Sequence, residues 1–123
     1  MRRRLLLPLL GLALAVSSCL SPTLPLPPPD EPSAINAGAT AGTWEVFGSC
    51  QAGALVTVFN EKTGHGVVVE DRAQSGSYHV TIEGAQCDLA WVTEQIGGDA
   101  SAPTSFVLAA RKPGDPRENP ACQ

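Results

Sequence analysis

The chain has 123 residues and is acidic, with 8 Lys and Arg against 12 Asp and Glu for a formal net charge of −4. This length holds one domain at most, which excludes a two-domain enzyme. No stretch of the sequence forms the basic stripe that phosphate binding needs, so we expect no nucleic-acid partner.

Residues 1–18 have the pattern of an export signal. Three arginines at positions 2–4 precede the apolar run Leu5–Val16, which Pro8 and Gly11 interrupt. As a helix this run would rise about 18 Å, which is short of the roughly 30 Å hydrocarbon core of a bilayer. The pattern therefore predicts a cleaved signal peptide rather than a permanent membrane span.

The apolar run ends in Val16-Ser17-Ser18-Cys19, which resembles the lipobox of bacterial lipoproteins. This resemblance implies that Cys19 is lipidated and becomes the first residue of the mature chain, which it would anchor in the membrane. Leu20 follows Cys19 where Asp would retain the protein, and by the enterobacterial sorting rule this implies the outer membrane. An ordinary secretory signal cut near Ser18 is the alternative. The mature chain keeps 5 basic and 12 acidic residues, so anionic lipid would repel it and the acyl chains must supply the attachment.

The distribution of proline and glycine divides the rest of the chain. Residues 19–41 hold six prolines and predict an extended, disordered linker. Residues 42–112 hold a single proline and nine of the 12 glycines, which marks them as the folded domain. Residues 113–123 are polar and rich in proline, and we expect a disordered tail.

Short apolar or alternating runs, bounded by turn residues, recur through the predicted domain. They predict six strands, at Trp44–Phe47, Ala54–Phe59, Gly66–Asp71, Ser77–Ile82, Asp88–Glu94 and Thr104–Ala109. The sequence therefore indicates an all-β domain, a small antiparallel β-sandwich of six or seven strands, with a small open barrel as the competing architecture.

Alternation within two of these runs predicts which side chains face the core. Tyr78, Val80 and Ile82 share one face of their strand, which we expect to point inward. Val56 and Val58 would also point inward, so that Leu55 and Phe59 point outward. Leu55 and Phe59 are therefore our candidate contact residues.

The segment Gly48–Phe59 resembles the opening of the bacterial Ig-like repeats found in surface adhesins, which read roughly G-T-A-x-x-G-A-x-V-T-V. The similarity continues at Gly76-Ser77-Tyr78 and at the turn Gly98–Pro103. It implies an Ig-like sandwich with a binding or adhesion role. The chain departs from the repeats in having one copy, few acidic turn residues and additional cysteines.

Three cysteines follow Cys19, and an exported protein meets oxidising conditions. Cys50 shares parity with the inward residue Val46, and Cys87 shares parity with Leu89 and Trp91, which we expect to point inward. We therefore expect a Cys50–Cys87 disulfide. Cys122 would remain in the tail, with pairing to Cys50, to Cys87 or to a partner as the alternatives. No two cysteines have the spacing of a zinc site, and we expect no metal.

Candidate catalytic groups are few and separated in the sequence. His65 lies in the expected turn 62–66, and His79 points outward on its strand. Glu70 and Asp71 are adjacent, so they point to opposite faces and are best read as a strand-end cap. Calcium held by Asp71 and Asp99 is an alternative, but that ion needs six to eight oxygens. We expect no catalytic residue, no cofactor and no enzyme activity.

The sequence thus predicts a lipid-anchored protein of the cell envelope with a non-catalytic binding, adhesion or structural module. Leu55, Phe59 or an exposed edge strand would contact an envelope protein or polysaccharide. One alternative is a small carbohydrate-binding module, which would need two or more exposed aromatic side chains on one face. Another is a regulatory or inhibitor module that presents the loop Glu61–Gly66.

Overall fold

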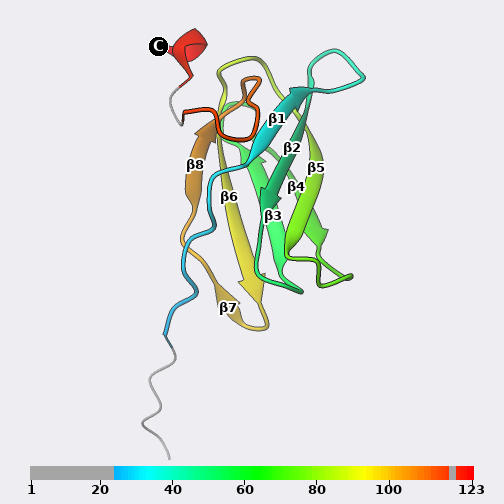
Figure 1. Cartoon of the computed structure of the whole chain (residues 1–123), viewed down its shortest axis with the longest axis vertical. Helices are drawn as coiled ribbons and strands as arrows, with labels where there is room; N and C mark the ends of the chain where they lie inside the picture. The colour runs from blue at the N-terminus through cyan, green and yellow to red at the C-terminus, as the bar shows by residue number, and fades with distance from the viewer. Residues whose placement is uncertain (1–23, 117–118) are drawn as a thin grey trace, which may run out of the picture.

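The computed structural model describes residues 24–116 and 119–123, so the predicted signal peptide and Cys19 lie outside the described residues (Figure 1). Eight strands and one 3₁₀ helix follow each other along the chain. They are β1 (Ala34–Ala37), β2 (Thr43–Ser49), β3 (Leu55–Asn60), β4 (His65–Glu70), β5 (Ser77–Glu83), β6 (Leu89–Ile96), β7 (Asp99–Ala100), β8 (Thr104–Val107) and the helix η1 (Pro120–Cys122).

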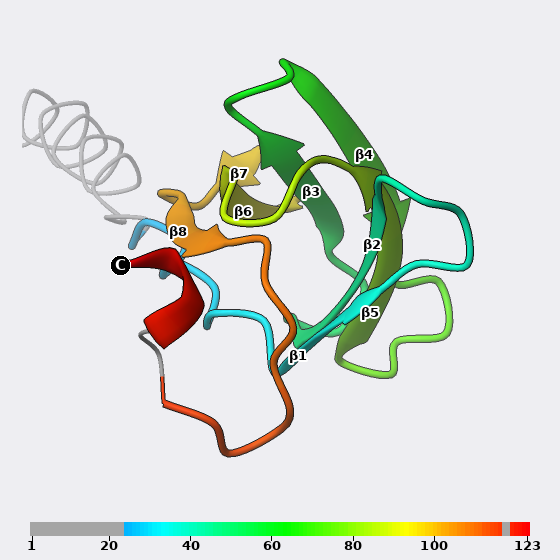
Figure 2. The same cartoon turned by 90° about the horizontal axis from the view of Figure 1, so that it is seen from above.

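The strands form two antiparallel sheets that face each other (Figure 2). One sheet has three strands in the order β1-β2-β5. The other has five, with β4-β3-β6 followed by β7 and β8, which both pair with β6. The prediction of an all-β domain of two antiparallel sheets is confirmed, and β1 and β7 are additions to the six strands expected.

The core lies between the sheets and is built by alternation along each strand. Val56 and Val58 of β3 are fully buried, and Tyr78, Val80 and Ile82 of β5 are at most 5% exposed. The facing predicted for β3 and β5 is therefore confirmed.

The facing predicted for β6 is wrong. Ala90, Val92 and Glu94 point inward, whereas Leu89 is 45% exposed and Trp91 is only partly buried. The prediction assigned the large apolar side chains to the core, but small residues fill this part of it. Glu94 is tolerated there because its carboxylate accepts a hydrogen bond from the backbone N–H of Gln51, at 2.8 Å.

The predicted boundary between linker and domain at residue 42 is also wrong, because the domain begins earlier. Pro29 and Pro32 are buried, the backbone N–H of Ser33 donates to Phe47 at 2.8 Å, and β1 pairs with β2. No proline follows Pro32 until residue 103, so the chain has the N–H groups that a ladder requires. An ion pair between Glu31 and Arg111, at 3.0 Å, further holds this segment to the domain.

The two ends of the sandwich differ in what they carry (Figure 1). Loops 50–54, 71–76 and 97–103 form what we term the carboxylate end, and the described N-terminal segment begins at this end. Loops 38–42, 61–64 and 84–88 form the opposite end, together with the C-terminal segment. We term it the disulfide end, because a Cys87–Cys122 disulfide attaches η1 there. The expectation of a disordered tail is wrong for residues 119–123, since the disulfide holds them.

Candidate binding surface

The outer face of the five-stranded sheet carries a pair of stacked aromatic side chains. Phe59 of β3 lies directly across from Trp91 of β6 in the strand register. Their ring centroids are 4.9 Å apart, with 30° between the ring planes. Both side chains are partly exposed.

Aliphatic side chains extend this pair across neighbouring strands. Leu55 is 39% exposed, Val68 of β4 is 62% exposed and Leu89 of β6 is 45% exposed. The strand registers place all three on the same side of the sheet as Phe59 and Trp91. We term the surface formed by Leu55, Phe59, Val68, Leu89 and Trp91 the apolar face.

The sequence positions the Phe59 ring through its neighbours on both sides. Val58 and Asn60 point into the core, so Phe59 must point out. On β4, the residue opposite Phe59 is Gly66. A Cβ atom at Gly66 would lie 2.9 Å from Cδ2 of Phe59, so glycine leaves the room in which this ring lies.

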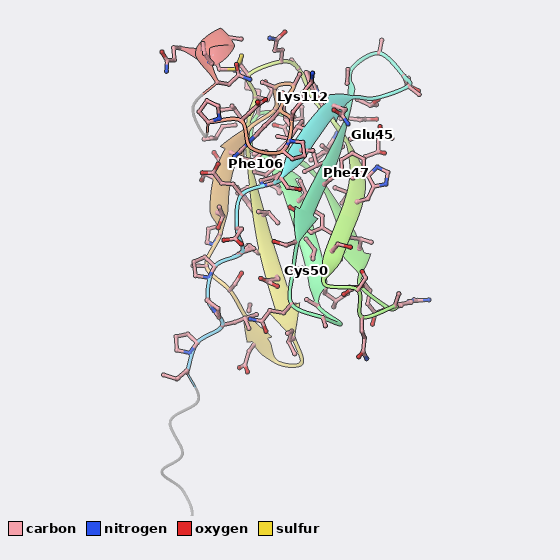
Figure 3. The ribbon with its side chains drawn as sticks, in the orientation of Figure 1. Glu45, Phe47, Cys50, Phe106 and Lys112 are labelled. Atoms are coloured by element: carbon pink, nitrogen blue, oxygen red, sulfur yellow. A yellow bond between two sulfur atoms is a disulfide. The ribbon has the colours of Figure 1, made fainter. Side chains whose placement is uncertain are left out.

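The outer face of the three-stranded sheet is more polar. Phe47 stacks on His79 with ring centroids 4.2 Å apart, and Nε2 of His79 lies 3.5 Å from a carboxylate oxygen of Glu45. Figure 3 shows Glu45 and Phe47 together on the outer side of β2. The exposed apolar side chains of the sandwich therefore gather on one of its two faces.

The predicted contact residues are placed as expected, with one addition. Leu55 and Phe59 do share an outward face. Trp91, which the sequence analysis assigned to the core, joins Phe59 on it. The register between β3 and β6 brings the two rings together, and this pairing is not visible in either strand alone.

The expected Cys50–Cys87 disulfide is wrong. Cys87 pairs with Cys122, with a Cα–Cα distance of 5.3 Å, and Cys50 is free. Parity predicted correctly that Cys50 packs against the core. Parity does not, however, tell at which end of the sandwich a residue lies. Cys50 lies at the carboxylate end (Figure 3), whereas Cys87 lies in loop 84–88 at the disulfide end.

Asp71 organises the carboxylate end, as the predicted strand-end cap. Its carboxylate accepts hydrogen bonds from the backbone N–H of Gly76 at 2.8 Å, of Ser75 at 3.0 Å and of Gly53 at 3.2 Å. The Ser75 hydroxyl donates a fourth bond at 2.9 Å. These donors, with Gly76 foremost, lower the pKa of Asp71 to about 2. The carboxylate is therefore committed to joining two loops.

Cys50 lies beside this cap, and its surroundings make it a poor nucleophile. Its sulfur is 4.0 Å from an Asp71 oxygen. Burial raises the pKa of the Cys50 thiol, and the negative charges of Asp71 and Glu94 raise it further. Because the thiolate is the reactive form, the thiol is kept in its inert state.

Asn60 connects the loops of the disulfide end, a role that was not expected from the sequence. Its side chain is fully buried, and its amide donates to Asp88 at 3.0 Å and to the backbone carbonyl of Glu83 at 3.1 Å. Its carbonyl accepts from the backbone N–H of Lys62 at 2.8 Å. The signal was present in the sequence, as a polar residue at an inward position of a strand.

The two histidines lie on the surface. His65 follows the β3–β4 turn, and its Nδ1 lies 3.2 Å from a carboxylate oxygen of Glu83, so this contact links the two sheets at their rim. Among residues 24–116 and 119–123, no group of three His, Cys, Asp or Glu side chains could hold a metal ion. No helix in this part of the chain is long and apolar enough to cross a membrane.

Fold and surface together define a small all-β domain of two antiparallel sheets with one apolar outer face. No known protein family, curated protein or solved structure matches the chain.

Proposed function

We propose that the chain is a lipid-anchored, non-catalytic binding module of the cell envelope, and that the apolar face is its contact surface. The observation that carries this proposal is the partly exposed Phe59–Trp91 stack on that face. Aromatic side chains contribute disproportionately to binding because they bury a large area at low cost in conformational entropy.

The surroundings of the stack favour a protein partner. Leu55, Val68 and Leu89 around the two rings are aliphatic and exposed, and such side chains fit between the side chains of another protein. A sugar platform needs polar groups beside its rings to bond hydroxyls. Thr57 and Thr93 lie between the aliphatic residues, so a polysaccharide is the second candidate, which the test below distinguishes.

The anchor at Cys19 rests on the lipobox pattern of residues 16–19. Because Pro27 and Pro28 line a hollow together with Cys50 and Glu94, the leash expected from the sequence is Leu20–Leu26, which would span about 22 Å at roughly 3.1 Å per residue. The described N-terminal segment begins at the carboxylate end, near the level of β7 (Figure 1). The leash would thus hold that end towards the membrane, with the disulfide end pointing away and the apolar face at the side.

An Ig-like character of the domain is part of the proposal. The glycines of the motif at Gly53 and Gly76 have φ values of 82° and 74°, a conformation that favours glycine. Their backbone N–H groups both donate to Asp71. The turns that carry the resemblance therefore have a structural reason for their sequence.

Photocrosslinking in native membranes tests the contact surface. A photoreactive phenylalanine analogue would replace Trp91 in one variant and Phe47 in a matched control, since Phe47 is the aromatic residue of the opposite face. We expect an adduct from position 91 and none from position 47. Protease sensitivity of the adduct indicates a protein, and glycosidase sensitivity indicates a polysaccharide. Equal yields at both positions, or no adduct at 91, would contradict the proposal.

Intact-mass spectrometry of the membrane-purified protein tests the anchor. We expect a mature chain that begins at Cys19 and carries added acyl mass, whereas a Cys19→Ala variant remains uncleaved or is released. A wild-type species without acyl mass would overturn the lipoprotein assignment.

A further inference from the structure

Strand β8 has an open edge. It pairs with β6, in the register Leu89↔Val107 to Val92↔Thr104. The backbone N–H of Leu108 donates to Asp88 at 2.9 Å, which fixes the phase of this ladder. Because hydrogen-bonding groups alternate along a strand, Phe106 bonds towards β6, while the N–H and C=O groups of Ser105 and Val107 point away from it.

The prolines of the N-terminal segment leave this edge unpaired. The chain from Pro29 to Ser33 runs beside β8 (Figure 1), and the Thr104 hydroxyl donates to the carbonyl of Pro29. Proline has no N–H to donate. No backbone hydrogen bond joins Ser105 or Val107 to the described residues of this segment or of the C-terminal segment.

A groove of about 420 Å³ lies over the open edge. Residues of β8, Glu31 of the N-terminal segment and residues of the C-terminal segment all contribute to its lining. Its lining includes Glu31, Leu89, Ser105, Val107, Asn119 and Cys122. Figure 1 shows η1 beyond the end of β8, and Figure 2 shows that it lies outside the two sheets. The Cys87–Cys122 disulfide fixes the C-terminal residues that line the groove.

We propose that this groove accepts an extended peptide segment of a partner protein, which adds to the sheet as a strand beside β8. Alternating outward N–H and C=O groups recognise an extended backbone, a chemistry that neither a sugar nor a lipid chain offers in the same repeat. The volume lies within the range of roughly 300–1,000 Å³ for ligand clefts. The inference rests on the proposed function in treating the domain as a binding module, but it uses the edge of β8 rather than the Phe59–Trp91 stack; Leu89 borders both surfaces.

Charge favours a basic peptide. Among the described residues, eleven acidic side chains face four basic ones. Leu89 also lines a neighbouring hollow that contains the two carboxylates of Glu61 and Asp88 and one ammonium group, that of Lys62, so its formal charge is still negative. Lysine or arginine flanking the added strand would lie near these carboxylates.

Two other occupants fit less well. A second copy would have to bring its own β8 edge, which is flanked by the same Glu31 and C-terminal residues. The N-terminal segment of the chain itself already contacts the start of β8 through Pro29, and it leads to the opposite end of the sandwich (Figure 1).

Amide hydrogen exchange with a defined probe tests the proposal on the full-length mature chain. The probe is the blocked peptide Lys-Thr-Val-Thr-Val-Lys, and its control replaces both valines with proline. In the free protein we expect the amides of Ser105 and Val107 to exchange at least tenfold faster than that of Phe106. Saturating probe, but not the proline control, should slow both amides at least tenfold.

Two variants at one position sharpen the test. Val107→Pro removes the outward N–H without touching the β6 ladder, and we expect at least a tenfold loss of probe affinity. Val107→Ala keeps that N–H and should bind like the wild type.

Amides that are already slow in the free protein would overturn the inference, as would probe binding that leaves them unprotected. Probe-induced changes confined to Phe59 and Trp91 would overturn it too, while leaving the apolar face as a contact surface. Failure of the crosslink at position 91 would contradict the proposed function and leave this result standing.

Discussion

The two ends of the sandwich are held together by different chemistry. At the disulfide end a covalent bond joins Cys87 to Cys122, and the buried amide of Asn60 connects the loops. At the carboxylate end no disulfide is present among the described residues. There, four hydrogen bonds to Asp71 join two loops.

This difference separates two ways of stabilising a small domain. A disulfide restricts the unfolded chain and is sensitive to reductant. A carboxylate cap stabilises the folded chain through its charge and is sensitive to acid. Reductant should therefore act on one end and strong acid mainly on the other. In the proposed orientation the disulfide end points away from the membrane, and its C-terminal residues line the β8 groove.

The largest effect is expected from Cys122→Ser. The cross-link spans a sequence separation of 35 residues, so its loss should lower the free energy of unfolding by about 4 kcal/mol in the chain-entropy treatment. Urea denaturation of the variant and the wild type measures this difference. Wild-type protein in excess reductant should match the variant, and an unchanged urea midpoint in both would contradict the assignment.

The next effect concerns pH and Asp71. Its pKa is about 2 in the folded chain and about 3.8 when unperturbed. A lowered pKa contributes stability that is present above about pH 4 and is lost as the pH falls towards 2. Between about pH 2 and pH 4, the thermal midpoint of the Asp71→Asn variant should change less with pH than that of the wild type. At pH 7 its thermal midpoint should be lower than that of the wild type. Asp99→Asn, at the same end but exposed, is the matched control and should follow the wild type.

Asp88 also contributes to the pH dependence of stability, so Asp71→Asn should reduce this dependence without abolishing it. The Asn60 side chain, and then the N–H of Ala85, lower the pKa of Asp88. The disulfide end therefore contributes some acid sensitivity of its own. If the Asp71→Asn variant kept the full wild-type pH dependence of its thermal midpoint, the acid sensitivity would have to come from other groups such as Asp88. That result would contradict the role given to Asp71.

The smallest effect is expected from Cys50. Its thiol pKa is raised, so alkylation by iodoacetamide at pH 7.5 should be at least tenfold slower in the folded protein than in urea. Cys50→Ser should change the free energy of unfolding by no more than about 1 kcal/mol, since the thiol holds no loop. Rapid labelling of the folded chain would show that the thiol is more accessible than its packing indicates.

The sequence predicted the sheets better than it predicted the cross-link. Alternation of Tyr78, Val80 and Ile82 is a local property, and it gave the core face of β5 correctly. The disulfide depends on which loops meet at one end, and that requires the order of strands. The same reason explains the error at Trp91, whose exposure follows from the register with Phe59 and from the burial of Glu94.

The site was predicted in part for a similar reason. Leu55 and Phe59 were expected on the surface because their neighbours had to be inside. Strand β1 was not predicted, because the prolines up to Pro32 indicated a linker that continued to residue 41. Residues 34–37 contain no proline and pair with β2. The groove beside β8 was not predictable at all, because it needs residues 31, 105 and 122 to lie together.

The apolar face is the central claim, and hydroxyl-radical footprinting tests it most directly. Oxidation of Trp91 and Phe59 would be compared with that of Phe47, in native membranes and in the purified protein. The account predicts several-fold slower oxidation of Trp91 and Phe59 in membranes, with Phe47 unchanged. Equal oxidation of Trp91 in both preparations would contradict it.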